Sequence, residues 1–228
     1  MKLIQIPFSH NCVKVRIALA RKGLAYDVED IPPSERGAVA RASGQRLVPV
    51  LVDDGRTVTD STAILLYLEE RYPDPPLVPR DARARAECLL LEDWADRTFM
   101  AASRRVGYFH VLAMRGKIGA LFFPGSRGVK RAVQERVAKR IVTKRFRISR
   151  HQYDKDVVDM RSAAALAIAR LGEGPYLFGR DLTIADIALA SMCAPLVVDA
   201  ELAKDPAVSA LLAWAEPIVG SDVMGAYR

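Results

Sequence analysis

Ser9, His10 and Cys12 are the first residues whose types and spacing could do chemistry. Residues 2–6 have the composition of a short buried strand, and residues 12–22 carry apolar side chains at helical spacing. Ser9 and Cys12 therefore lie where a helix begins. The unpaired N–H groups and positive dipole end of a helix favour an anion, including a thiolate. Because position 9 is serine, a disulfide within this motif is excluded.

The residues alone allow two interpretations of this serine. Its hydroxyl can donate a hydrogen bond to a thiolate that belongs to another molecule. Alternatively, Ser9 caps the helix and Cys12 fills a small buried space. Both interpretations place the two side chains at the N-terminal end of the same helix.

A proline at the start of a strand-like run marks a second candidate feature, in Leu47-Val48-Pro49-Val50-Leu51. A cis Val48-Pro49 bond would expose the backbone N–H and C=O of Val48 to a bound peptide. A trans bond would instead be an ordinary feature of a strand edge. The sequence does not decide between the two.

Two further polar motifs stand at predicted helix starts. Asp60 and Ser61 either satisfy the first helical N–H groups or, together with them, hold the amine and carboxylate of a ligand. Thr183 and Asp186 have the spacing of a capping box, which we interpret as structural.

Four prolines within residues 73–79 mark the clearest boundary in the chain, because proline cannot continue a helix or a central strand. Before them, strand and helix patterns alternate in the order βαβαββα. After them, helical patterns dominate. We therefore expect an α/β domain at residues 1–79 and an all-helical domain at residues 80–228.

Two of the predicted helices carry further expectations. In the helix predicted over residues 81–99, we expect Leu90, Leu91 and Trp94 to face inward. Apolar residues then recur every four positions in a basic stretch, which predicts an amphipathic helix; they are Val129, Val133, Val137 and Ile141.

The composition excludes several classes of protein. The chain has 228 residues, of which 50% are hydrophobic and 27% charged, so it is not mainly disordered, collagen-like or coiled coil. No apolar run approaches the roughly 18 residues that span a membrane. Three scattered cysteines make neither a disulfide framework nor a zinc site. With no apolar signal segment near residue 1, we expect a cytoplasmic protein.

The net charge of +7 is concentrated in one segment. Residues 127–150 contain ten cations and one anion, Glu135, while residues 1–79 are balanced. This segment is either a solvated helix face or a surface for an acidic partner. It contains a single aromatic residue, Phe146, which gives poor support for base stacking, so we expect no nucleic acid partner.

Taken together, the four motifs resemble the glutathione transferase superfamily in their order and spacing. The resemblance covers nearly the whole chain and is weakest over residues 101–150. It implies a thioredoxin-like N-terminal domain followed by an all-helical C-terminal bundle. It rests on Phe8-Ser9-His10-Asn11-Cys12, Val48-Pro49-Val50-Leu51, Asp60-Ser61-Thr62-Ala63-Ile64 and Leu182-Thr183-Ile184-Ala185-Asp186.

The resemblance also implies a role for each motif. Ser9 matches the position that supports the glutathione sulfur. Val48, before a cis Pro49, matches the backbone clamp on the cysteinyl unit. Asp60 and Ser61 match the pair that holds the γ-glutamyl end.

The sequence departs from the superfamily in part of this site. Leu47 stands where many relatives have lysine, so Gln45 or Arg46 would have to meet the glycine carboxylate. Cys12 or His10 is an alternative to Ser9 as the key polar group.

We therefore expect a glutathione transferase, a homodimer, that uses glutathione as co-substrate with no other cofactor and no metal. Its acceptor would be a small apolar electrophile. Two alternatives are a non-catalytic relative that engages an acidic partner through residues 127–150, and a Cys12-dependent thiol oxidoreductase. Candidates for the acceptor pocket are Trp94, Phe99, Tyr108, Phe109, Met114, Phe122 and Phe123.

Overall fold

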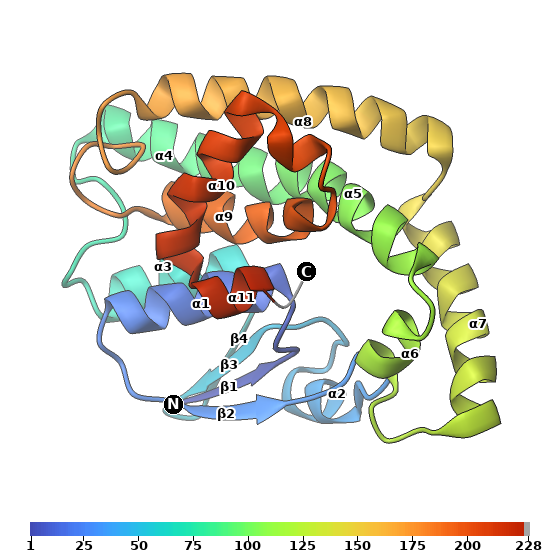
Figure 1. Cartoon of the computed structure of the whole chain (residues 1–228). Coiled ribbons are helices and arrows are strands. Elements are labelled where there is room, and N and C mark those ends of the chain that lie inside the picture. The colour runs from blue at the N-terminus through green and yellow to red at the C-terminus, as the bar shows by residue number, and fades with distance from the viewer. Residues whose placement is uncertain (226–228) are drawn as a thin grey trace.

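The computed structural model describes residues 1–225. Its N-terminal part, up to Arg71 and called the sheet half below, is built on one mixed sheet, and the helices from Ala82 onward are called the helical half (Figure 1). The strands lie in the order β2-β1-β3-β4. Strand β1 (Lys2–Gln5) pairs in parallel with β2 (Asp27–Asp30) and antiparallel with β3 (Val50–Asp53), which pairs antiparallel with β4 (Arg56–Thr59).

Helices cover both faces of this sheet because its strands alternate their apolar side chains. Leu3 of β1 packs with α1 (His10–Arg21) and α3 (Ser61–Arg71) on one face. Its neighbour Ile4 packs on the other face with α2 (Gly37–Ser43). The predicted order βαβαββα is confirmed.

The remaining part of the described chain is helical, as predicted, and most of it stacks over the α1–α3 side of the sheet (Figure 1). Helices α4 and α5 are one continuous helix joined by a π-helical turn. The helical elements are α4 (Ala82–Trp94), the π turn (Ala95–Phe99), α5 (Met100–Ala113), α6 (Lys117–Phe122), α7 (Gly128–Phe146), α8 (Arg150–Leu171), α9 (Ile184–Cys193), 3-10 turns at Ala194–Val198 and Leu202–Lys204, α10 (Pro206–Val219) and α11 (Ser221–Gly225).

Helix α9 is the centre of the molecule, since all of its residues are buried. It packs against α1 of the sheet half and against α4 and α10 of the helical half. The capping box at its start is confirmed: Thr183 and Asp186 exchange hydrogen bonds. One apolar core therefore runs from the sheet through α1 into the helices.

Buried ion pairs also join the two halves. The amino group of Lys14, on α1, is wholly buried, donates to Glu92 of α4, and lies 3.0 Å from Thr62 Oγ1 and 3.2 Å from Asp96 Oδ1. A further buried pair lies within the sheet half itself, where Lys22 at the end of α1 donates to Glu69 of α3 at 3.0 Å.

One expectation about an inner face is wrong. Leu90 is 71% exposed, because the inner face of α4 is formed by Cys88 and Glu92, one turn apart. The helix predicted over the basic stretch is confirmed as α7, and its four-residue apolar repeat is exposed, from 81% at Val129 to 52% at Val137. The buried residues of α7 are Ala138 and Val142, and Ile141 at the end of the repeat lines a cavity together with Val142.

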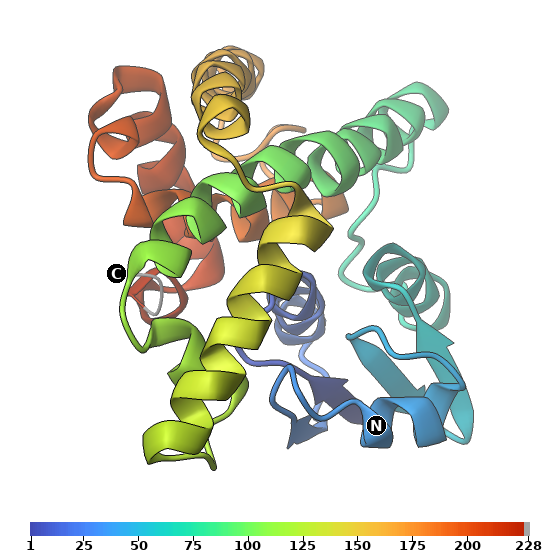
Figure 2. The same ribbon diagram turned by 90° about the vertical axis from the view of Figure 1, so that its right-hand side faces the viewer.

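Helices α6 and α7 form an arm at one side of the molecule (Figures 1 and 2). Figure 2 shows α7 running from the level of α5 down to the level of the sheet half. None of the helices within residues 1–225 is both long enough and apolar enough to cross a membrane.

Candidate active site

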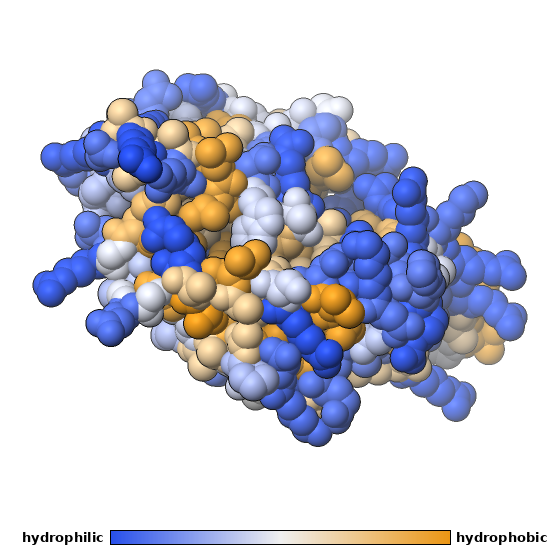
Figure 3. All heavy atoms as spheres, turned by 90° about the horizontal axis from the view of Figure 1, so that it is seen from above, coloured by the Kyte–Doolittle hydropathy of each residue, from blue (hydrophilic) through white to orange (hydrophobic). Residues whose placement is uncertain are grey.

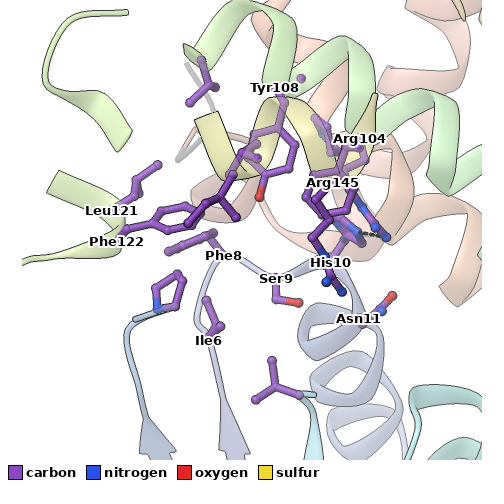
Figure 4. Close-up of a pocket in the computed structure, with 18 of the residues that line it drawn as sticks. Ile6, Phe8, Ser9, His10, Asn11, Arg104, Tyr108, Leu121, Phe122 and Arg145 are labelled. Atoms are coloured by element: carbon purple, nitrogen blue, oxygen red, sulfur yellow. Dashed lines mark hydrogen bonds between the residues drawn. The ribbon is translucent and has the colours of Figure 1, made fainter. Parts of the chain in front are cut away.

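A cavity of about 320 Å³ lies between the start of α1 and the arm formed by α6 and α7 (Figure 4). The sheet half contributes Phe8, Ser9 and Val48 to its wall. Helices α5, α6 and α7 supply the opposite wall. The cavity therefore exists because the arm stands across the N-terminal end of α1.

Ser9 occupies the N-cap position of α1, yet its hydroxyl makes no capping hydrogen bond. Its carbonyl oxygen accepts from the backbone N–H groups of Cys12, at 2.8 Å, and Val13, at 2.9 Å. The capping role considered for this side chain is therefore wrong, and the backbone alone closes the first turn. The hydroxyl lines the cavity instead (Figure 4).

The thiol of Cys12 is fully buried behind Ser9. Burial raises its pKa to about 11, although hydrogen bonds with the Ile6 backbone and the Ser9 side chain oppose this shift. The thiol is therefore protonated and inaccessible near neutral pH. These are the properties of a packing residue, since the nucleophile in thiol chemistry is an accessible thiolate.

The imidazole of His10 is held neutral. Burial and the nearby Arg104 and Lys14 lower its pKa to about 3. Its Nε2 atom lies 3.4 Å from Nη2 of Arg104, which can only donate, so the ring hydrogen is on Nδ1. Nδ1 is buried and has no hydrogen-bond partner among the described residues.

The Val48-Pro49 peptide bond is cis, as the resemblance implied. Val48 lines the cavity with Ser9, and so does Leu47, which is 65% exposed. The side-chain amide of Gln45 is engaged locally, because its Nε2 donates to the Leu47 carbonyl at 2.8 Å and its Oε1 accepts from the Leu47 N–H.

Comparison with known proteins identifies the fold around this cavity. A family model described as "Glutathione S-transferase, N-terminal domain" matches residues 3–76. The crystal structure of a glutathione S-transferase from Rhodospirillum rubrum F11 superposes with a TM-score of 0.71 at 26% identity, covering 98% of this chain and 89% of that one. Residues 3–76 therefore match the N-terminal domain family of the glutathione transferase superfamily, and the chain as a whole has a glutathione S-transferase fold.

Other relatives show a range of described activities within this superfamily. A glutathione S-transferase of Triticum aestivum is 39% identical over 72 residues, which are 32% of this chain and 34% of that protein. A maleylacetoacetate isomerase of Pseudomonas aeruginosa is 41% identical over 93 residues, 38% of this chain and 44% of that one. The chain thus matches less than half the length of these curated relatives.

The likeness in fold extends further than the likeness in sequence. The β-etherase of Sphingobium sp. strain SYK-6 gives a TM-score of 0.74 at 21% identity, covering 99% of this chain and 97% of that one. At this identity the comparison concerns the fold alone.

Asp60 and Ser61 stand at the start of α3. Asp60 Oδ1 accepts from the Ala63 N–H at 3.1 Å, so the capping interpretation is confirmed for one of its oxygens. Ser61 is buried. Of the described residues, those that line the cavity include neither of these two, nor Gln45, Arg46 or Pro49. Their roles toward glutathione stay predictions.

Of the seven side chains expected at an acceptor pocket, Tyr108 and Phe122 line the cavity. Phe99 is buried in the core beside Trp94, with ring centroids 5.7 Å apart, and Phe109 stacks on Tyr153. Met114 and Phe123 are also absent from the described lining.

The sequence interpretation missed residues on the arm and on α5. Phe146 stacks on Tyr108 at 5.3 Å between ring centroids, and Arg104 lies over the Phe146 ring at 5.0 Å. These residues line the cavity with Arg145. The sequence signal for this part of the cavity is Phe146, the single aromatic residue of the basic segment. From the sequence alone, this ring bears only on base stacking.

Proposed function

We propose that the protein is a glutathione transferase in which Ser9 stabilises the glutathione thiolate. The observation that supports this most directly is the Ser9 hydroxyl, which lies at the N-terminal end of α1, lines the cavity and makes no capping bond. Both the hydroxyl and the helix dipole favour an anionic sulfur at this point.

The energy required is modest. A free thiol has a pKa near 8.5, and lowering it by about two units needs roughly 2.7 kcal/mol of preferential stabilisation of the anion. A hydrogen bond to a charged group supplies about 1.5–3 kcal/mol. Ser9 and the helix terminus together are therefore sufficient, and neither Cys12 nor His10 is required.

In the proposed reaction the glutathione thiol first releases its proton to solvent. The thiolate then attacks an electrophilic carbon of the acceptor, and a C–S bond forms. The bond to the leaving group breaks, and the leaving group departs with its electron pair. Val48, Asp60 and Ser61 would hold the peptide, with Gln45 or Arg46 at its glycine carboxylate, in a cytoplasmic homodimer.

Titration calorimetry with glutathione tests the binding site. We expect micromolar to low-millimolar binding to the wild type that is lost in an Asp60→Ala, Ser61→Ala variant. No binding at several millimolar would overturn the proposal.

The activity test uses Ser9→Ala, with Ser209→Ala, an exposed serine on α10, as the matched control. We expect Ser9→Ala to raise the pKa of bound glutathione toward 8.5 and to lower turnover near neutral pH by roughly 10- to 100-fold. The control should change neither. If Cys12→Ala abolished turnover while Ser9→Ala were harmless, the thiol oxidoreductase alternative would replace this proposal.

We also propose a second candidate function, in which the outer face of α7 binds an acidic amphipathic helix of a partner protein. Val129, Val133 and Val137 are exposed there beside three cations that are exposed as well, Arg136, Arg140 and Lys144. Figure 3 shows hydrophilic side chains projecting at the end of the molecule where α7 lies, with hydrophobic ones between them. This combination is complementary to a helix with one apolar and one acidic face.

A synthetic acidic amphipathic peptide, followed by fluorescence anisotropy, tests this second function. We expect salt-sensitive binding that a Val133→Ser, Val137→Ser variant weakens. Equal binding of a peptide with the same composition in scrambled order would contradict it.

A further inference from the structure

The cavity wall is strongly cationic. Four of the side chains that line it are Arg36, Arg104, Lys117 and Arg145, and its described lining contains no aspartate or glutamate. Arg36 precedes α2, whereas the other three come from α5, α6 and α7 in turn. Figure 4 shows Arg104 and Arg145 next to each other above His10.

Three of these cations are not neutralised by carboxylates within residues 1–225. No ion pair joins Arg36, Lys117 or Arg145 to a described acidic side chain, whereas Arg105, on the outer side of α5, is paired with the buried Asp156 at 2.6 Å. Arg36 donates only to the Pro33 carbonyl, at 3.0 Å. The cavity wall therefore carries positive charge that no described carboxylate compensates.

The charges repel one another across this space. The pKa of Arg36 is lowered by burial and, to a smaller extent, by Arg145. A second cation near a first is unfavourable unless an anion joins them. A bound anion would relieve this repulsion.

An apolar surface faces the same space. Phe8, Tyr108, Phe122 and Phe146 line the cavity, and the stacked pair of Tyr108 and Phe146 offers a flat wall. The hydroxyl of Tyr108 points toward Phe8 and Ser9 in Figure 4. An acceptor here meets aromatic rings and cations together.

We propose that the acceptor is a flat apolar electrophile that carries an anionic group, such as a carboxylate or sulfonate. Its apolar body lies against Tyr108 and Phe146, and its anion is held by Arg145 and Lys117, with its electrophilic carbon toward Ser9. This inference rests on the proposed function. The carboxylates of glutathione do not account for these cations, because its predicted carboxylate partners lie on the sheet half, outside the cavity.

A matched pair of acceptors tests the inference. One is a chlorodinitrobenzoate, with its chlorine para to the carboxylate, and the other is its neutral methyl ester. In both, the thiolate forms a bond to the carbon that bears chlorine, and chloride leaves with the electron pair. Each enzymatic kcat/KM is divided by the uncatalysed rate with glutathione, which corrects for the different reactivity of the two rings.

We expect the wild type to prefer the benzoate by roughly tenfold or more after this correction. Arg145→Gln and Lys117→Gln should each lower kcat/KM for the benzoate much more than kcat/KM for the ester, and so remove most of that preference. Arg140→Gln is the matched control, because Arg140 is an exposed arginine of the same helix outside the described cavity lining. It should leave the preference intact.

Equal corrected rates for the two acceptors would overturn the inference. The inference would also be overturned if Arg140→Gln lost as much of the preference for the benzoate as Arg145→Gln. Such a result would mean that the overall positive charge of the surface attracts the acceptor. If neither acceptor reacts although glutathione binds, the proposed function fails. In that case, calorimetry with each acceptor alone tests the inference. The inference requires that the protein bind the benzoate more tightly than the ester, and that Arg145→Gln bind the benzoate more weakly than the wild type.

Discussion

Three neighbouring residues at the start of α1 have different chemical environments, although all are polar or ionisable. The Ser9 hydroxyl lines the cavity, His10 is kept neutral between cations, and the Cys12 thiol is kept protonated by burial. Spacing alone made each of them a candidate. Because His10 and Cys12 are buried, Ser9 is the candidate among these three that can stabilise a bound thiolate.

The neutral His10 has a consequence for stability. In the unfolded chain its pKa is near 6.5, and in the folded protein it is about 3, so below pH 6.5 the unfolded state binds a proton that the folded state does not. Stability from this residue is therefore present above the unfolded pKa and lost as pH falls toward the folded one. From pH about 7.5 to about 5.5 the loss is about 1.4 kcal/mol.

Chemical denaturation of the wild type and His10→Gln across this pH range measures the difference. We expect the variant to lose about 1.4 kcal/mol less than the wild type. His151→Gln, which removes an exposed histidine on α8, is the control and should follow the wild type. Parallel curves for the wild type and His10→Gln would contradict the assignment of a neutral ring.

The sequence located the centre of the candidate site but not its extent. Ser9 and Val48 share one cavity, and both belong to motifs set by a local strand or helix boundary. The direction of Gln45 was not predictable, because its amide is engaged by the backbone of Leu47, two residues away. Asp60 illustrates a different difficulty, since capping and ligand binding require the same residue type.

At the scale of elements, the close approach of α5 to the 3-10 turn Ala194–Val198 forms part of the cavity wall. A Cβ atom at Gly107 would lie 2.8 Å from Pro195 Cβ and 3.3 Å from its carbonyl oxygen. We expect Gly107→Ala to lower the free energy of unfolding by about 1–3 kcal/mol through overpacking, despite the better helix propensity of alanine.

Thermal or urea unfolding measures this effect. Gly125→Ala is the control, because an added Cβ there meets nothing within 4 Å. An unchanged Gly107→Ala variant would mean that the turn moves away easily, and the cavity wall would then be deformable.

Helix α7 shows why element identity is easier to predict than orientation. Its helical spacing was evident, but the obvious apolar repeat is exposed and the inner face is formed by Ala138 and Val142. A helix packed on one side against a short helix such as α6 buries few residues. Gly119 of α6 faces α7, since a Cβ there would lie 2.8 Å from Glu135 Oε2 and 3.1 Å from Arg131 Cγ.

At the scale of the whole molecule, Lys14 fixes α1, and with it Ser9, to the helical half. Its amino group and the Glu92 carboxylate are both almost fully buried, and the amino group also contacts Thr62 and the less buried Asp96. Removing one partner of such a pair leaves a buried charge, whereas replacing both with apolar side chains does not. No sequence pattern indicates this pair, because the two residues are 78 positions apart.

We therefore expect Glu92→Leu to lower the free energy of unfolding by about 3–5 kcal/mol, and the double variant Lys14→Met, Glu92→Leu to be more stable than Glu92→Leu alone. Asp93→Ala breaks an exposed pair with Arg97 on the same helix and should cost no more than about 1 kcal/mol. Urea unfolding of the four proteins measures all three effects. If the double variant were no more stable than Glu92→Leu, packing around α1 rather than charge pairing would hold the two halves together.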